Sequence, residues 1–302
     1  ELEASQLGTT LIEQLLKTSN LETDLSSEIM MGQVYTAGGG LKPARSASVK
    51  AGLPYSVPAA TVNQVCGSGL KAIIMGTESI LVDKSKVVIA GGMESMTNAP
   101  YLLEKAREGF RIGHGESKDH MFLDGLEDAY EPGRLMGTFA EDCADRYVFS
   151  REDQDDFAIE SLTRAKEAIE SGAFENEVVP VTVSDRTGEH LVDYDEQPLK
   201  GNVENIPSLK PAFRKSGTVT AANSSSISDG AAALVLMRLS AAERGGHVPL
   251  AKIVGHASHA QEPALFTTAP VFAISKLLEK LNWKAADVDL YEINEAFAVV
   301  TM

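Results

Sequence analysis

The sequence predicts an α/β fold in which strands and helices alternate along the chain. Helical periodicity over residues 3–18 precedes a strand-like stretch at 29–34, and a second helical pattern at 44–51 precedes a short strand before Cys66. The run 86–92 is continuously apolar and ends in glycines, which is typical of a strand buried on both faces. Such alternation favours a largely parallel sheet covered by helices on both sides.

Composition is that of an ordinary globular protein and argues against several classes. The chain has 302 residues, of which 43% are hydrophobic, so it is long enough for one large core or two smaller ones. A net charge of −16 argues against nucleic acid or an anionic membrane as a partner. No apolar run approaches the roughly 20 residues that cross a bilayer. A content of only two cysteines is typical of a reducing compartment, so we expect a cytoplasmic protein.

Cys66 lies between the end of a predicted strand and the start of a predicted helix. Unpaired backbone N–H groups and the helix dipole at such a position favour a thiolate. Gly67 and Gly69 are expected to let the backbone turn sharply and a substrate approach closely. A nucleophilic cysteine and a buried structural cysteine both fit these residues. Cys143 lies in a helical stretch without a glycine turn and is interpreted as structural.

The middle of the chain is less regular than its first part. Residues 98–227 combine charged loops with one strong helix, which starts with a capping-box pattern at Ser150. The stretch 178–183 contains a proline and predicts an edge strand. Small polar residues at 218–230 either contact a polar ligand or form turns ahead of a buried strand at 231–237.

A further α/β pattern follows in the last part of the chain. It predicts a strand within 252–260, a helix at 271–281 and a strand at 288–294. Asn294 is therefore expected at the carboxyl end of a strand, where open α/β sheets place functional groups. The six histidines are scattered, and His256 and His259 would face opposite sides of a strand, so no metal site is expected. No phosphate-binding loop, dinucleotide fingerprint or serine-hydrolase elbow occurs.

Five sequence blocks occur in a characteristic order and spacing along the whole chain. They are Asn63–Gly69, Gly91–Met96, Met136–Gly137, Asn223–Gly230 and Asn294–Ala298. Together they resemble the thiolase family, including its bacterial acetyl-CoA acetyltransferases. The blocks around Cys66 and Asn294 are the most specific of the five.

The resemblance implies a thiolase fold of layered αβαβα architecture with two similar halves and an inserted loop domain. The N-terminal half would comprise residues 1–97 and 228–248, the loop domain residues 98–227, and the start of an incomplete C-terminal half residues 249–302. Family members are homodimers or homotetramers that use coenzyme A and acyl-CoA as substrates and need no cofactor. A role in fatty acid metabolism follows from the same likeness.

The resemblance also implies an acyltransferase that cleaves 3-ketoacyl-CoA or condenses two acetyl-CoA through an acyl-cysteine on Cys66. The backbone N–H of Cys66 would contribute to one oxyanion hole, and Asn294 would hold a water for a second. Ser225, near Ala221, would contact the pantetheine arm of coenzyme A. The acyl pocket would be lined by Leu135, Met136, Phe266 and Phe297. Short-chain members often carry histidine where this chain has Leu135, so the preferred acyl length stays open.

Two motifs of the family do not occur in these residues. One is the Gly-His-Pro histidine that activates the nucleophile, and the other is a second cysteine in a Cys-x-Gly-Gly-Gly run that moves the α-proton. We therefore expect the chain to be cut at its C-terminus and to show no measurable thiolysis by itself. We expect a cut at the N-terminus as well, because the chain starts inside a predicted helix with no strand before it. A non-catalytic module that binds acyl-CoA or a partner subunit, and a decarboxylating condensing enzyme, remain alternatives.

Overall fold

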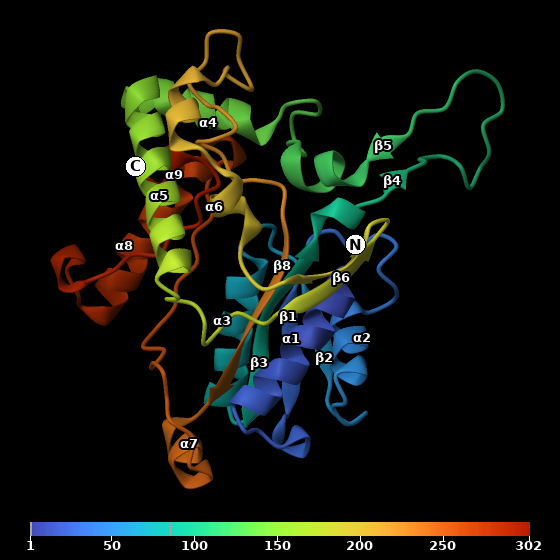
Figure 1. The fold of residues 1–302 in the computed structure, drawn as a ribbon, viewed down its shortest axis with the longest axis vertical. Coiled ribbons are helices and arrows are strands. Elements are labelled where there is room, and N and C mark those ends of the chain that lie inside the picture. Colours follow the sequence, from blue (N-terminus) through green and yellow to red (C-terminus); the bar gives the residue numbers. More distant parts are fainter. Residues whose placement is uncertain (1, 85) are drawn as a thin grey trace. The chain divides into compact units, whose positions relative to one another are not determined.

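The structure is a computed structural model that describes residues 2–84 and 86–302 (Figure 1). Its internal contacts divide the chain into two compact units. Unit 1 comprises Glu1–Ala129, Val179–Asp193 and Ile227–Lys252, and unit 2 comprises Tyr130–Val178, Tyr194–Ser226 and Ile253–Met302. Each unit has a buried apolar cluster of its own.

Unit 1 is built on a four-stranded sheet with the order β2-β1-β3-β8. The strands are β1 (Glu28–Gly32), β2 (Ala59–Val62), β3 (Val87–Ser95) and β8 (Asp229–Met237). β1 runs parallel to both β2 and β3, whereas β8 pairs antiparallel with β3. The prediction of a largely parallel sheet is confirmed for this unit.

The last strand, β8, is more exposed than its apolar sequence predicts. Leu236 is buried, but Leu234 is 46% exposed. β8 lies at the edge of the sheet and pairs with β3 alone. An apolar run predicts a strand correctly here, but it does not predict how completely the strand is covered.

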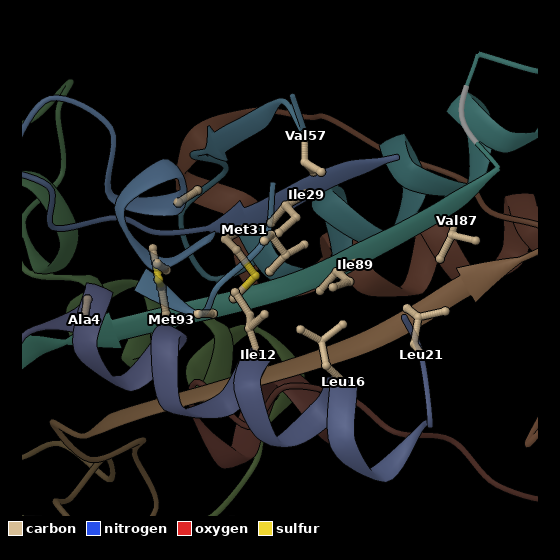
Figure 2. Packing of buried hydrophobic residues seen from close by; sticks show 14 residues of the cluster. Ala4, Ile12, Leu16, Leu21, Ile29, Met31, Val57, Val87, Ile89 and Met93 are labelled. Carbon is tan, nitrogen blue, oxygen red and sulfur yellow. The ribbon is translucent and has the colours of Figure 1, made fainter. Parts of the chain in front are cut away.

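Helices cover both faces of the sheet. They are α1 (Ala4–Thr18), α2 (Pro43–Lys50) and α3 (Ser68–Leu81). Successive side chains of β3 point to opposite faces: Ile89 joins the cluster that contains Ile12 of α1, whereas Val88 contacts Ile80 of α3. Figure 2 shows the first cluster, with Ile12 and Leu16 of α1 pointing toward the strands. The helices expected from periodicity in this part of the chain are confirmed.

The remaining elements of unit 1 are short. They are β4 (Tyr101–Leu102), β5 (Lys118–Asp119), β6 (Val181–Asp185), β7 (Gly188–Val192), α7 (Leu239–Gly245) and the turns Thr23–Leu25, Met96–Asn98 and Phe122–Leu126. β6 pairs with β7 as a two-stranded hairpin. It begins directly after Pro180, so the proline lies outside the ladder, as expected for a residue that has no N–H to donate.

Unit 2 is mainly helical. Its elements are α4 (Met136–Tyr147), α5 (Arg151–Glu170), α6 (Glu196–Lys200), α8 (Ala269–Leu281), α9 (Ala298–Thr301) and the 3₁₀ turns η4 (Val203–Ser208), η5 (Pro263–Thr268) and η6 (Ala285–Asp287). The predicted capping box is present: Ser150 Oγ accepts from the backbone N of Asp153 at 3.0 Å, and the carboxylate of Asp153 accepts from the backbone N of Ser150 at 2.9 Å. The helix predicted over 271–281 is α8.

Two predicted strands in unit 2 are wrong. The stretches 252–260 and 288–294 carry no strand, and neither belongs to any sheet of the described residues. An extended apolar stretch becomes a strand only where its backbone groups pair with a neighbouring strand. His259 accordingly does not alternate with His256 across a strand; its ring stacks on Phe272 at 4.9 Å.

Candidate functional site

Cys66 directly precedes the N-terminus of α3. β2 ends at Val62, Gly67 is the N-cap residue of α3, and the helix begins at Ser68. Cys66 is an exposed residue, although protein atoms surround much of its sulfur. The structure thus has Cys66 at the mouth of a helix and at the carboxyl end of parallel strands, where the sequence pattern predicts it.

The turn that presents Cys66 is held by side chains on both sides of it. Ser68 Oγ accepts from the backbone N of Gln64 at 2.8 Å and donates to the carbonyl of Val65 at 2.6 Å. Asn63 Oδ1 accepts from the backbone N of Val65 at 3.0 Å. Val65 has φ +50°, a left-handed conformation that β-branched residues rarely adopt. The hydrogen bonds of Ser68 and Asn63 therefore hold a strained residue directly before the nucleophile.

The sharp turn falls on Val65 rather than on the glycines predicted to allow it. Gly67 has φ −82°, which any residue can adopt. Glycine is required instead at the end of β1: a Cβ on Gly32 would lie 2.5 Å from the backbone N of Gly69. Gly32 thus lets the first turn of α3 approach the sheet closely.

The thiol of Cys66 is less acidic than its place before a helix predicts. Protein atoms around the sulfur reduce its hydration, and this desolvation raises the pKa of the thiol above its ordinary value. A hydrogen bond from the backbone N–H of Cys66 itself acts in the opposite direction and lowers the pKa, but by less. The expected preference for thiolate is corrected accordingly, and a base is needed to take the proton of Cys66.

A polar group that sequence reasoning missed lies within the same unit. Glu94, at the end of β3, accepts hydrogen bonds from the backbone N atoms of Val34 at 2.7 Å and Tyr35 at 3.2 Å. Burial raises the pKa of Tyr35 to about 12, and the charges of Glu94 and Cys66 add to the shift. Tyr35 therefore stays neutral, and its hydroxyl donates to the carbonyl of Met121 at 3.3 Å. An acidic residue ending a buried strand is the signal that points to this group.

Unit 2 contains the other predicted site residues, and a short ladder joins two of their segments. Ser224 bridges Phe297 in antiparallel fashion. The backbone N of Ser225 donates to the carbonyl of Ala296 at 2.9 Å, and Ser225 Oγ donates to the carbonyl of Glu295 at 2.5 Å. The exposed Asn294 lies immediately before this ladder. The structure thus brings Ser225 beside the block that contains Asn294.

Three of the residues predicted to line an acyl pocket share one apolar cluster. Met136, Phe266 and Phe297 pack with residues of α4 and α9, and Phe297 is 8% exposed. The rings of Phe213 and Phe297 meet edge to face at 6.0 Å. Leu135 precedes α4 as its N-cap residue.

The buried faces of α4 are tightly packed. A Cβ on Gly137 would lie 2.3 Å from the ring of Phe213, so this helical position leaves no room for a larger residue. Cys143 is buried in the cluster that contains Met136 and Phe297, as expected of a structural cysteine.

Glu141 is fully buried, and its carboxylate accepts from the backbone N atoms of Thr218 at 2.9 Å and Val219 at 3.1 Å. A glutamate on the apolar face of a helix is the sequence signal for such a structural carboxylate.

An open cavity of about 420 Å³ lies within unit 2. It is lined by side chains of three kinds of segment, namely one face of α5, the turns at 197–209 and the loop at 221–226, together with Glu295 and Ala298. Ala221, one of the predicted site residues, belongs to this lining. Amides, hydroxyls and small apolar groups dominate the walls, and no lysine or arginine is among the lining residues. The cavity suits an uncharged polar ligand segment better than a phosphate.

Neither a metal site nor a membrane span is found in the described part of the chain. No three His, Cys, Asp or Glu side chains among residues 2–84 and 86–302 are grouped so as to hold a metal ion. Among the same residues, no helix has both the length and the apolar character needed to cross a bilayer.

Comparisons with known proteins define the family. A model described as the thiolase N-terminal domain matches residues 1–240, and one described as the thiolase C-terminal domain matches residues 247–302. The chain belongs to the thiolase family, and it has the thiolase fold.

Similar proteins carry closely related names. An acetyl-CoA acetyltransferase of Pseudomonas aeruginosa is 46% identical over 303 residues, which cover 100% of this chain and 77% of that protein. A probable acetyl-CoA acyltransferase of Staphylococcus aureus is 42% identical, with 100% of this chain and 77% of that protein covered. The crystal structure of the Bacillus anthracis acetyl-CoA acetyltransferase matches with a TM-score of 0.95 at 38% identity, covering 100% of this chain and 76% of that one.

Proposed function

We propose that this protein is an acyltransferase that acts on 3-ketoacyl-CoA and acetyl-CoA through an acyl-enzyme on Cys66. The observation that carries the proposal is the exposed residue Cys66, presented by a strained and hydrogen-bonded turn at the start of α3 in a member of the thiolase family. Rigid presentation of a nucleophile on a scaffold is what covalent catalysis requires. Relatives named acetyl-CoA acetyltransferase favour this activity over the non-catalytic and decarboxylating alternatives.

In the proposed reaction the Cys66 thiol loses its proton to a base, and the sulfur attacks the thioester carbonyl. The tetrahedral intermediate collapses as the carbon–sulfur bond to coenzyme A breaks, and the coenzyme A thiolate takes up a proton. In condensation the acetyl group then passes from Cys66 to the enolate of a second acetyl-CoA. In thiolysis of 3-ketoacyl-CoA the sulfur instead attacks the 3-keto carbonyl, the bond between C2 and C3 breaks, and acetyl-CoA leaves as its enolate and takes up a proton. The thiol of coenzyme A then accepts the acyl group from Cys66. Because desolvation raises the pKa of Cys66, removal of its proton needs a base.

The remaining site residues have proposed roles, and the surroundings of Ala221 support one of them. The backbone N–H of Cys66 contributes to one oxyanion hole, and Asn294 holds a water for a second. Ser225 and Ala221 contact the pantetheine arm; Ala221 lines a cavity whose amide and hydroxyl walls suit the amides of that arm. Acyl-pocket roles are proposed for Leu135, Met136, Phe266 and Phe297.

The organisation of the protein in the cell is proposed on the same basis. We expect a cytoplasmic homodimer or homotetramer of fatty acid metabolism that needs no cofactor. We divide the chain into an N-terminal half (1–97 and 228–248), a loop domain (98–227) and the start of a C-terminal half (249–302). The family alone supports these assignments.

Incubation of the full-length protein with acetyl-CoA, followed by peptide mass mapping, tests the proposal. We expect one acetyl group on Cys66, none on that peptide in Cys66→Ser, and unchanged labelling in Cys143→Ser, because Cys143 is buried in α4. Acetylation that persists at another residue in Cys66→Ser would overturn the assignment. So would binding of acetyl-CoA with no transfer at any pH, which would favour the non-catalytic alternative.

A further inference from the structure

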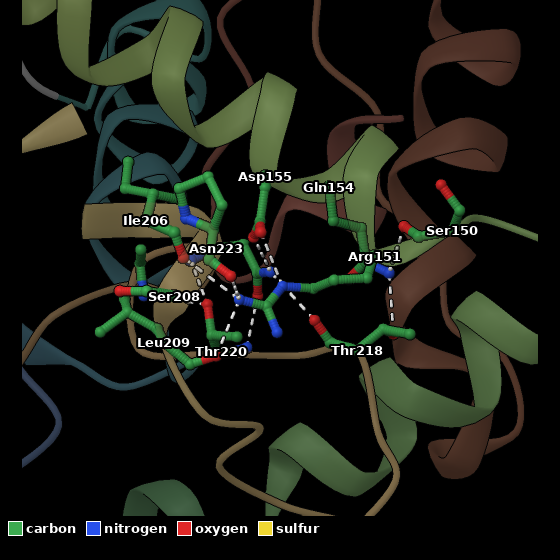
Figure 3. A network of polar contacts seen from close by, with 12 residues as sticks. Ser150, Arg151, Gln154, Asp155, Ile206, Ser208, Leu209, Thr218, Thr220 and Asn223 are labelled. Atoms are coloured by element: carbon green, nitrogen blue, oxygen red, sulfur yellow. Dashed lines mark hydrogen bonds and ion pairs between the residues drawn. The ribbon is translucent and has the colours of Figure 1, made fainter. Parts of the chain in front are cut away.

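A chain of buried polar groups links α5 to the loop that precedes Ser225. Asp155 on α5 has a side chain that is 6% exposed. One of its carboxylate oxygens accepts from Arg151 Nε at 2.7 Å, and the other accepts from Asn223 Nδ2 at 3.3 Å. Figure 3 shows Asp155 between the guanidinium of Arg151 and the amide of Asn223. Both carboxylate oxygens are thus satisfied, as a buried charge requires.

Arg151 ties this carboxylate to the wall of the cavity in unit 2. Its Nη2 donates to the carbonyls of Ile206 at 3.1 Å, Pro207 at 3.3 Å and Leu209 at 2.8 Å. Ile206 and Leu209 line the cavity. The position of η4, and so the width of the cavity on that side, depends on where Asp155 holds the guanidinium.

Asn223 ties the same carboxylate to a second segment of the cavity lining. Its Oδ1 accepts from the backbone N of Thr220 at 2.7 Å, and its Nδ2 also donates to the carbonyl of Thr218 at 3.1 Å. Its own carbonyl accepts from the backbone N of Ala298 at 2.9 Å. Asn223 as a whole is 3% exposed. Its side chain therefore holds the turn at 218–223, and its backbone holds the ladder that contains Ser225.

We propose that Asp155 and Asn223 are positioning residues for acyl-CoA: the pair holds the cavity walls and the Ser225 ladder in register, with Asn223 part of the cavity lining and Asp155 behind it. The inference rests on the proposed function, because it assigns the cavity and the ladder to acyl-CoA. One carboxylate orders two segments, at 206–209 and 218–225, that both lie far from Asp155 in sequence. A defect in the pair changes both walls at once.

The pair consists of one hydrogen-bond donor, Asn223, and one acceptor, Asp155. Exchanging the two residue types therefore tests the proposal. Asn223→Asp places a second carboxylate against Asp155 and the carbonyl of Thr218, so that acceptors face acceptors. Asp155→Asn in the Asn223→Asp background restores one donor and one acceptor with the direction of the bond reversed. We expect the affinity for coenzyme A to fall roughly 10- to 100-fold in Asn223→Asp and to recover at least in part in the double variant.

The experiment measures coenzyme A binding by titration calorimetry on the full chain, for the wild type, both single variants and the double variant. Glu160→Gln serves as the matched control, because Glu160 pairs with Arg164 on the exposed face of the same helix; we expect its affinity to be unchanged. The rate at which iodoacetamide alkylates Cys66 is measured in parallel and is expected to be the same in every variant.

Wild-type affinity in a folded Asn223→Asp, or no recovery in a folded double variant, would overturn the inference. If Asn223→Asp does not fold, the comparison of Asp155→Asn with the double variant decides, since only a positioning pair predicts tighter binding by the double variant. Wild-type protein that neither binds coenzyme A nor becomes acetylated on Cys66 would instead refute the proposed function. The two failures are therefore distinguishable.

Discussion

Replacing Ser68 by alanine removes the hydroxyl that closes the turn before Cys66. Ser68 is 4% exposed, and its hydroxyl bonds the backbone N of Gln64 and the carbonyl of Val65. The carbonyl of Val65 keeps a second partner, the backbone N of Ser68 at 3.0 Å. The loss therefore falls mainly on the Gln64 N–H and on the restraint that keeps Val65 at φ +50°.

The magnitude follows from these contacts. One lost hydrogen bond costs about 1 kcal/mol of stability. A β-branched residue in the left-handed conformation is strained by about 1–3 kcal/mol, and without the hydrogen bond of Ser68 this strain can relax. We expect the free energy of unfolding to fall by about 1–2 kcal/mol and Val65 to relax. Displacing a reacting group by about 1 Å can cost roughly 100-fold in rate, so acetylation of Cys66 should slow by roughly 10- to 100-fold.

A time course with acetyl-CoA, quantified by mass mapping of the Cys66 peptide, measures this effect. Glycine adopts a positive φ without strain, so Val65→Gly should itself be tolerated and should restore part of the rate when combined with Ser68→Ala. The reasoning is refuted if Ser68→Ala is acetylated at the wild-type rate. It is refuted equally if the double variant is no faster than Ser68→Ala while both are folded.

Three further predictions concern pH and packing. Because desolvation raises the pKa of Cys66, the rate of its alkylation should reach half of its maximum at a pH above the usual thiol pKa of about 8.5. Cys66 should also be alkylated faster than the buried Cys143. A midpoint at or below about pH 8.5 contradicts the desolvation argument. The pKa of Tyr35 is raised from 10.0 to about 12, so the neutral phenol is favoured by folding, and the resulting stability is lost as pH rises from 10 through 12. Denaturant titrations of Tyr35→Phe at pH 10 to 12 should not show that loss of stability. If the variant and the wild type lose stability identically with pH, the role of Tyr35 is contradicted. Gly137→Ala should lower Tm despite alanine's higher helix propensity, because overpacking against Phe213 costs about 1–3 kcal/mol; an unchanged or higher Tm would show that the ring can move.

Local sequence was sufficient wherever the physical signal is local. The helix over Ala4–Thr18, the capping box at Ser150 and the strand after Lys86 follow from periodicity and from contacts within a few residues. Such patterns predict which face of an element is apolar. They fail for 252–260 and 288–294, because a strand depends on a partner whose presence the stretch itself does not encode.

The candidate site divides in the same way. The amino-acid sequence by itself determined that Cys66 follows a strand and precedes a helix. The order of the sequence motifs determined the family. Only the tertiary structure decided that Val65 rather than a glycine takes the left-handed turn, that desolvation raises the pKa of Cys66, and that Asp155 meets Asn223. The reason is physical: strain, desolvation and buried hydrogen bonds depend on atoms that are distant along the chain. A local sequence pattern does not show which distant atoms will be in contact in the folded protein.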